Sequence, residues 1–261
     1  MALESMLLLG DIPAGLRPQP LLLLGPAGSG RSALLFRAAL VRAASSPARV
    51  LFLAPRPLER LPGGGTAAAG AIQRIHFLYP PCLRELLQLV ASLHETFSSS
   101  LSLIVLDGLE EYLGSCSSSS EVAHLMALLL DTANHFKQKL STDSAASCPL
   151  IVSMKYPGEA LEEEEHLSIV ERYISARCWL HPDAEEHSNP DVQDGGKVIK
   201  ACLSRPGAKD QEWLVRFDPQ GNMTISSLPC RCETDSGTVS GKAEEHLVAS
   251  GFLSLNSGGL Q

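Results

Sequence analysis

Eight residues near the start of the chain have the types and the spacing that bind phosphate. They match the P-loop pattern G-x-x-x-x-G-K-[ST], except that an arginine replaces the lysine. Glycines let the backbone wrap closely around an anion, so that successive N–H groups point at phosphate oxygens, and the following helix adds its positive N-terminal end. The alternative is a glycine-rich turn without a ligand. The predicted nucleotide-binding residues are Gly25, Pro26, Ala27, Gly28, Ser29, Gly30, Arg31 and Ser32.

Two side chains of this P-loop carry the predicted chemistry. The Ser32 hydroxyl is expected to bind a magnesium ion, and the Arg31 side chain to reach the β and γ phosphates. Arg31 keeps the positive charge of the usual lysine, but its planar guanidinium differs from a compact ammonium. On charge alone, an Arg31→Lys substitution would weaken nucleotide binding less than Arg31→Ala. The loop therefore predicts nucleotide binding rather than fast hydrolysis.

A carboxylate ends the strongly apolar segment 101–107. Such an acid downstream of a P-loop is typical of the Walker-B position, which holds magnesium through water or polarises the attacking water. We therefore predict that Asp107 is a catalytic residue and, with Ser32, a metal-binding residue. The alternative is that Asp107 only caps the next turn. Glu110 and Glu111 are alternative general bases, but both are expected to face solvent.

Alternating strands and helices are predicted to position these residues. Near-continuous apolar runs indicate strands buried on both faces, and longer segments with one apolar face indicate helices. The expected strands are 21–24, 49–54, 72–79, 101–107 and 149–153, and the expected helices are 32–42, 80–95, 121–139 and 162–173. This alternation predicts an α/β fold with a mostly parallel sheet, in which Asp107 and the P-loop meet at the carboxyl ends of the strands.

The pattern changes after Cys178. Short strands at 178–180, 197–203, 212–217 and 223–226, separated by turn residues, predict an antiparallel C-terminal extension. Residues 19–227 are therefore expected to form one core. Residues 1–18 are expected to form an N-terminal leader, and residues 228–261, rich in Ser, Gly, Thr and charged residues, a disordered tail.

Composition narrows the class of protein. Seven cysteines without a C-x-x-C pair favour neither a zinc site nor a disulfide framework and fit a reducing compartment. Neither a signal peptide nor a membrane-spanning segment is expected. The net charge of −8 argues against a general nucleic-acid-binding protein, but residues 1–100 carry nine arginines and five acidic residues. Local basic surface is thus compatible with binding to a phosphate backbone.

Several segments resemble the RecA-type recombinase ATPases, and among them the recombinase paralogues of the Shu complex that work with a SWIM-type zinc-finger protein. The P-loop and the strand that ends in Asp107 are generic to P-loop NTPases, whereas FLYPP, LDGLEEYL and LLLDTANHF are more specific. The supporting segments are LLLLGPAGSGRSALL (21–35), RVLFLAPRP (49–57), FLYPPCLRELL (77–87), SLIVLDGLEEYL (102–113), ALLLDTANHF (127–136) and CWLHPD (178–183).

The resemblance implies a RecA-like P-loop NTPase core that binds ATP and Mg²⁺. It further implies single-stranded DNA binding, DNA-stimulated ATP hydrolysis and an obligate SWIM-domain partner. Such a heteromer would promote assembly of a recombinase, together with recombinase paralogues, in nuclear homologous recombination repair and in meiosis. By position, the P-loop would hold phosphates and magnesium, and Asp107 would be the Walker-B acid.

Three residues depart from the family pattern. Arg31 replaces the P-loop lysine, Arg56 lies about where the water-activating glutamate is expected, and Lys155 stands in place of the glutamine that senses the γ-phosphate. Loss of a catalytic carboxylate slows hydrolysis by orders of magnitude. The expected activity is therefore a slow ATPase, and the alternative is a non-catalytic P-loop scaffold that stabilises its partner. A small-molecule P-loop kinase is a third interpretation, but no arginine-rich lid is recognisable.

Overall fold

A computed structural model describes residues 19–58, 69–97, 100–114, 118–140, 148–156, 161–182, 196–219 and 222–228. Chain contacts divide the protein into a unit of residues 1–230 and a second unit of residues 231–261, and every described residue belongs to the first. The predicted leader 1–18 and the predicted tail 228–261, apart from Leu228, lie outside the described residues, so both boundaries stay predictions.

The described part of the chain builds one nine-stranded sheet with the order β3-β2-β4-β5-β1-β6-β7-β8-β9. The first six strands in this order are parallel, and β7, β8 and β9 continue the sheet in antiparallel pairing. The strands are β1 Leu21–Gly25, β2 Arg49–Leu53, β3 Ile75–Leu78, β4 Leu101–Leu106, β5 Leu150–Lys155, β6 Ala176–Pro182, β7 Lys197–Ser204, β8 Gln211–Phe217 and β9 Met223–Ser227. This topology confirms the predicted fold class.

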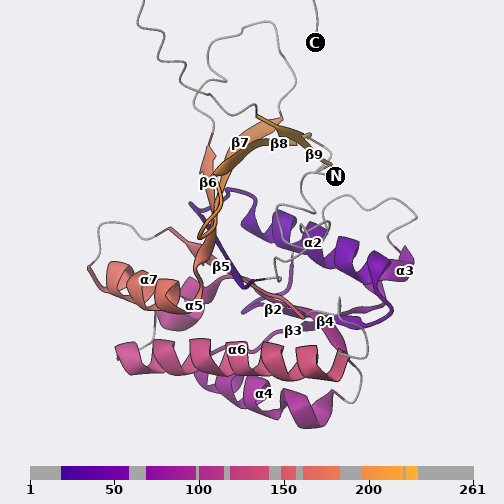
Figure 1. The fold of residues 1–261 in the computed structure, drawn as a ribbon, viewed down its shortest axis with the longest axis vertical. Helices are drawn as coiled ribbons and strands as arrows, with labels where there is room; N and C mark the ends of the chain where they lie inside the picture. Colours follow the sequence, from indigo (N-terminus) through magenta and orange to yellow (C-terminus); the bar gives the residue numbers. More distant parts are fainter. Residues whose placement is uncertain are drawn as a thin grey trace, which may run out of the picture. The chain divides into compact units, whose positions relative to one another are not determined.

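Helices cover both faces of the parallel part of the sheet (Figure 1). Helix α2 packs on one face, and α4, α6 and α7 pack on the other. The helices are α2 Arg31–Ser45, α3 Ala69–Ile72, α4 Leu83–Thr96, α5 Leu109–Leu113, α6 Ser119–Leu140 and α7 Leu161–Tyr173. Among the residues described, none of the helices combines the length and apolar content that a membrane crossing requires.

The all-leucine segment of β1 shows why this strand occupies the centre of the sheet. Leu21 and Leu23 belong to the core on the α2 side, whereas Leu22 and Leu24 belong to the core on the opposite side. All four side chains are fully buried, because neighbouring residues of a strand point to opposite faces and both faces are covered. The P-loop therefore begins, at Gly25, from a strand that is held firmly on both faces.

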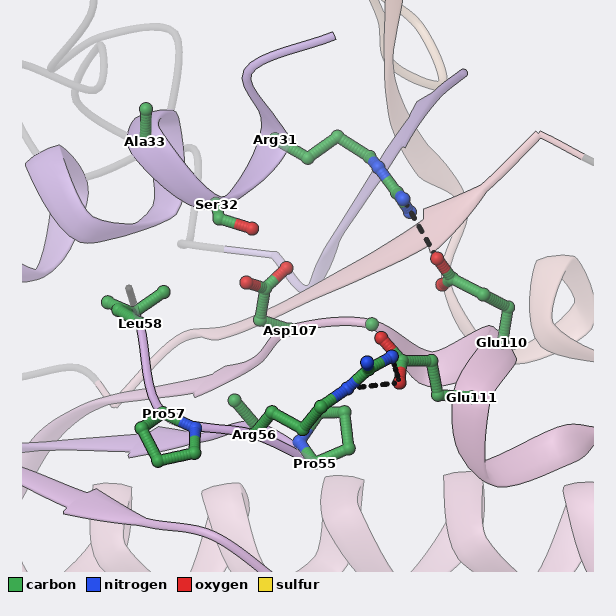
Figure 2. Close-up of a pocket in the computed structure, with 12 residues that line it drawn as sticks. Arg31, Ser32, Ala33, Pro55, Arg56, Pro57, Leu58, Asp107, Glu110 and Glu111 are labelled. Carbon is green, nitrogen blue, oxygen red and sulfur yellow. Dashed lines mark hydrogen bonds and ion pairs between the residues drawn. The ribbon is translucent and has the colours of Figure 1, made fainter. Parts of the chain in front are cut away.

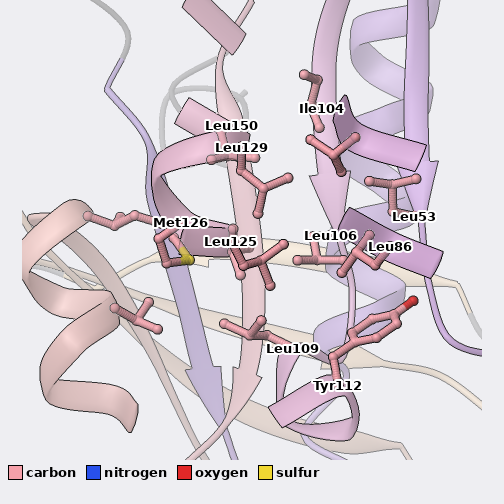
Figure 3. Close-up of a cluster of buried hydrophobic side chains, with 14 of the residues drawn as sticks. Leu53, Leu86, Ile104, Leu106, Leu109, Tyr112, Leu125, Met126, Leu129 and Leu150 are labelled. Atoms are coloured by element: carbon pink, nitrogen blue, oxygen red, sulfur yellow. The ribbon is translucent and has the colours of Figure 1, made fainter. Parts of the chain in front are cut away.

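A second cluster of buried side chains supports the segment that follows β4 (Figure 3). Leu109 and Tyr112 of α5 pack there with residues of α4, α6 and the sheet, such as Leu86, Leu125 and Leu106. The Tyr112 hydroxyl donates a hydrogen bond to the Pro80 carbonyl oxygen at 3.0 Å, so the buried ring keeps a polar partner. This packing fixes α5, and with it two glutamates, at the edge of the sheet where the strands end.

Several predicted elements differ from the structure. The helix expected at 80–95 begins only at Leu83. The strand expected at 178–180, as part of the antiparallel extension, is β6, which pairs in parallel with β1 and in antiparallel with β7. The strand expected at 72–79 is shorter, because α3 occupies Ala69–Ile72 and a turn closed by Arg74 N and Ala71 O precedes β3. Helix α6 begins at Ser119, two residues before the predicted start of the helix at 121–139. Small polar residues favour both loops and the first turn of a helix, so the local sequence did not distinguish these alternatives.

Candidate nucleotide-binding site

The P-loop forms a tight turn between β1 and α2. Gly28 and Gly30 have φ angles of +73° and +81°, in the left-handed region that residues with a Cβ rarely adopt. Gly30 is the N-terminal cap of α2, and its carbonyl oxygen accepts the first helical hydrogen bond, from Leu34 N, at 2.9 Å. The loop thus leads directly from a buried strand into a helix, as the motif predicts.

Two of the glycines are needed for close packing, and one of them, Gly30, is also needed for its backbone conformation. A Cβ at Gly25 would lie 2.5 Å from Ser29 Oγ, and a Cβ at Gly30 would lie 2.7 Å from Cζ of Phe217 in β8. Neither position leaves room for another side chain. The C-terminal antiparallel strands therefore buttress the P-loop, although they are far from it in the sequence.

A pocket of about 430 Å³ opens beside the start of α2 (Figure 2). Its wall is formed by three segments: the start of α2, the residues after β2 and the residues after β4. Ser32 and Asp107 both line it, so the structure brings the two predicted magnesium-binding residues to one place; their roles stay predictions. The lining residues are Arg31, Ser32, Ala33, Ala54, Pro55, Arg56, Pro57, Leu58, Asp107, Gly108, Glu110 and Glu111.

Asp107 is held in position by a buried serine, Ser153, that belongs to no sequence motif. Ser153 Oγ donates a hydrogen bond to Asp107 Oδ1 at 2.5 Å and accepts one from Gly108 N at 2.9 Å. Ser153 is fully buried and Asp107 is 7% exposed. One Asp107 oxygen thus bonds to the neighbouring strand, and the carboxylate points toward the Ser32 hydroxyl (Figure 2).

Arg31 does not extend over the P-loop but crosses to α5. Its Nη2 lies 2.8 Å from Glu110 Oε1, and the two side chains are 14% and 24% exposed. The second Glu110 oxygen, Oε2, accepts a hydrogen bond from Lys155 N at 2.9 Å. The prediction that Glu110 faces solvent is therefore wrong: packing of α5 turns this carboxylate toward the P-loop arginine.

The arginine that follows β2 also pairs with α5. Arg56 donates from Nε to Glu111 Oε2 at 3.1 Å, and its Nη2 forms an ion pair with the same oxygen. The side chains are 77% and 39% exposed, so this pair lies at the rim of the pocket. Glu111 is partly exposed, as expected, but its carboxylate is engaged by the residue that stands where the water-activating glutamate was expected.

Lys155 lies at the end of β5, opposite Gly25 in the parallel register. Its side chain is exposed, and its backbone N–H is the group that bonds to Glu110. A second lysine, Lys197 at the start of β7, donates from Nζ to the Gly28 carbonyl oxygen at 2.5 Å. No sequence motif points to Lys197, because only the pairing of β6 with β7 brings this strand beside the P-loop.

The residues present fit a nucleotide with its magnesium ion. Ser29 Oγ and Arg31 Nη1 are buried and have no hydrogen-bond partner within the described part of the protein. Buried polar groups are rarely left unpaired, and phosphate oxygens would accept hydrogen bonds from both. A hydroxyl at Ser32 and a carboxylate at Asp107 are oxygen ligands of the kind that magnesium prefers.

Comparisons with known proteins agree with this architecture. Among solved structures, the chain is similar to the RadB recombinase (TM-score 0.55, 18% identity, 87% of this chain and 96% of that chain). It is also similar to a DnaB-like replicative helicase (TM-score 0.55, 9% identity, 79% of this chain and 57% of that chain). At these identities the similarity shows the fold: a RecA-like core.

Two curated relatives are similar in sequence, whereas no family model matches the chain. The human ATPase SWSAP1 is 44% identical over 214 residues, which cover 80% of this chain and 90% of the relative. The mouse ATPase SWSAP1 is 40% identical over 213 residues, which cover 79% of this chain and 73% of the relative. Identity at this level over most of both chains confirms the predicted relationship, and the protein belongs to the ATPase SWSAP1 family.

Proposed function

We propose that this protein binds ATP with Mg²⁺ and hydrolyses it slowly, with stimulation by single-stranded DNA. In a heteromer with a SWIM-domain zinc-finger protein, it promotes recombinase assembly in nuclear homologous recombination repair and in meiosis. The observation that carries the proposal is the meeting of Ser32 and Asp107 at one pocket, with Ser32 placed directly after an intact P-loop turn. Two relatives that are 40–44% identical and named ATPases support it.

The roles within the site follow from residue chemistry. The backbone N–H groups of the P-loop and the Ser29 hydroxyl would bind phosphate oxygens. Ser32 and Asp107 would hold the magnesium ion, which neutralises phosphate charge when bound. Ser153 fixes Asp107 by a hydrogen bond, so the carboxylate needs little reorganisation when it binds the ion.

Slow turnover follows from Arg56. A general base contributes about 10²–10⁴-fold to a reaction of this class, and the residue after β2 supplies a cation instead of a carboxylate. Glu111 lies beside this position, but its carboxylate is paired with Arg56. The same observation favours the second candidate function, a P-loop scaffold that binds nucleotide without turnover and stabilises its partner.

DNA binding is proposed from the family relationship, and four arginines are candidate phosphate contacts: Arg56, Arg60, Arg74 and Arg84. Arg56 pairs with Glu111, and Arg74 donates from Nε to the Ala43 carbonyl oxygen at 2.7 Å. Arg84 is exposed on α4, whereas Arg60 lies outside the described residues. A steep loss of DNA affinity with rising salt would support direct phosphate contacts, which release counterions.

ATP turnover tests the proposal. The purified protein, alone and with its SWIM-domain partner, is assayed with and without single-stranded DNA, beside Asp107→Asn and the control Asp131→Asn. Asp131 is exposed on α6, outside the pocket. We expect DNA to stimulate hydrolysis, Asp107→Asn to reduce it and Asp131→Asn to leave it unchanged. Equal rates in Asp107→Asn and the parent would refute the catalytic assignment, and ATP binding without turnover would establish the scaffold.

A further inference from the structure

The two terminal nitrogens of the Arg31 guanidinium differ in their hydrogen bonding. Its Nη2 is paired with Glu110 at 2.8 Å, whereas its Nη1 is buried without a hydrogen-bond partner among the described residues. The side chain is only 14% exposed. A guanidinium carries its N–H donors in one rigid plane, so fixing one nitrogen also fixes the direction of the other. The pair with Glu110 therefore sets where the unsatisfied Nη1 donors point.

Glu110 is itself anchored at both carboxylate oxygens. Oε1 pairs with Arg31, and Oε2 accepts the hydrogen bond from Lys155 N at 2.9 Å. The neighbouring residue, Tyr156, donates from its backbone N to the Gly25 carbonyl oxygen at 3.1 Å, so the end of β5 is also tied to the start of the P-loop. A carboxylate held from two sides presents a fixed partner to the arginine.

We infer that Glu110 is a positioning residue, which orients the Arg31 guanidinium of this P-loop for binding to phosphate. Glu110 holds Nη2, and Nη1 is left to donate to a phosphate oxygen of the bound nucleotide. This role rests on the proposed nucleotide binding and adds to it the group that orients the basic side chain. An ammonium has a single nitrogen. In Arg31→Lys, one nitrogen can therefore not bind Glu110 while a second one, held in a fixed direction, binds phosphate.

The expectation based on charge alone leaves out this geometry. Lysine preserves the charge at position 31 but cannot keep the contact with Glu110 and at the same time present a second nitrogen in a fixed direction. The contribution of Glu110 to nucleotide binding must then depend on the arginine. Two residues that act through one contact give non-additive effects, which a double-mutant cycle measures.

The cycle uses the full-length protein, ATP and ADP as ligands, and isothermal titration calorimetry. The variants are Glu110→Gln, Arg31→Lys and the double substitution. Glu171→Gln is the matched control, because Glu171 forms a comparable ion pair with Arg177 at 2.9 Å, is 25% exposed and lies away from the pocket. Thermal unfolding without nucleotide checks that each variant folds.

We expect Glu110→Gln to weaken ATP binding about tenfold, the loss that a misplaced charge-assisted hydrogen bond produces. In the Arg31→Lys background, the same substitution is expected to change affinity by less than about twofold, because the fork is already absent. ATP is expected to lose more affinity than ADP, since the basic side chain of a P-loop reaches the β and γ phosphates. Glu171→Gln should bind both ligands like the parent.

The outcomes separate this inference from the proposed function. Failure of the parent protein to bind ATP would overturn the proposed function. If the parent binds ATP but Glu110→Gln binds as tightly or more tightly, Glu110 competes with phosphate or plays no part, and the inference is overturned. Equal effects of Glu110→Gln in both backgrounds, with equal losses for ATP and ADP, would show a general structural role and would also overturn it.

Discussion

Replacing Ser153 with alanine removes the hydroxyl that links Asp107 to β5. The substitution eliminates a hydrogen bond to a carboxylate, at 2.5 Å, and leaves Gly108 N without the acceptor that it has at 2.9 Å. Ser153 is fully buried, so water does not easily replace the hydroxyl. A hydrogen bond to a charged group contributes about 1.5–3 kcal/mol, and an unsatisfied buried donor costs about 1–3 kcal/mol.

Because these two terms overlap, we expect Ser153→Ala to lower the free energy of unfolding by about 2–4 kcal/mol. Ser102→Ala is the matched control: Ser102 is a buried strand serine, 1% exposed, whose hydroxyl makes longer bonds to neutral carbonyl oxygens, 3.2 Å to Arg49 and 3.4 Å to Ala48. Loss of such bonds is expected to cost about 0.5–1 kcal/mol.

Urea unfolding followed by circular dichroism measures the difference, provided that both variants keep the same dependence of free energy on urea. The additional loss of about 2 kcal/mol in Ser153→Ala corresponds to a lowering of the melting temperature by about 4–8 °C for a domain of this size. Equal unfolding midpoints for the two variants would refute the argument that Ser153 stabilises the segment carrying Asp107.

Two further predictions test the packing. Gly30→Ala is expected to lower the free energy of unfolding by about 1–3 kcal/mol, because φ is +81° and the added Cβ would lie 2.7 Å from Phe217 Cζ; a urea midpoint equal to that of the parent would contradict this. In the native protein, iodoacetamide at pH 8 should modify the exposed Cys82 well before the buried Cys148 and Cys178. Burial raises the pKa of the Cys148 and Cys178 thiols to about 12, so both stay protonated until the pH approaches that value. Peptide mapping by mass spectrometry measures the labelling, and similar rates at the three cysteines would show that the two buried sites open readily.

Features that depend on the local order of residues were predictable from the sequence. Strand β1, the P-loop turn and α2 were predictable because an apolar run, glycines and helix formers follow one another without interruption. Asp107 was predictable as a site residue because it ends a buried strand, and all parallel strands end at the same edge. Segment similarity to the recombinase paralogues indicated the family from the sequence alone.

Which side chains meet at the site depends on the packing of elements that are far apart in the sequence. Glu110 lies 79 positions from Arg31, and Ser153 lies 46 positions from Asp107. Their contacts depend on the order of the strands and on the packing of α5. Neither of these can be predicted from the periodicity of a single segment. For the same reason, the sequence showed that the P-loop carries an arginine, but the fold decided that this arginine is paired with a glutamate and that the turn before it packs against Phe217.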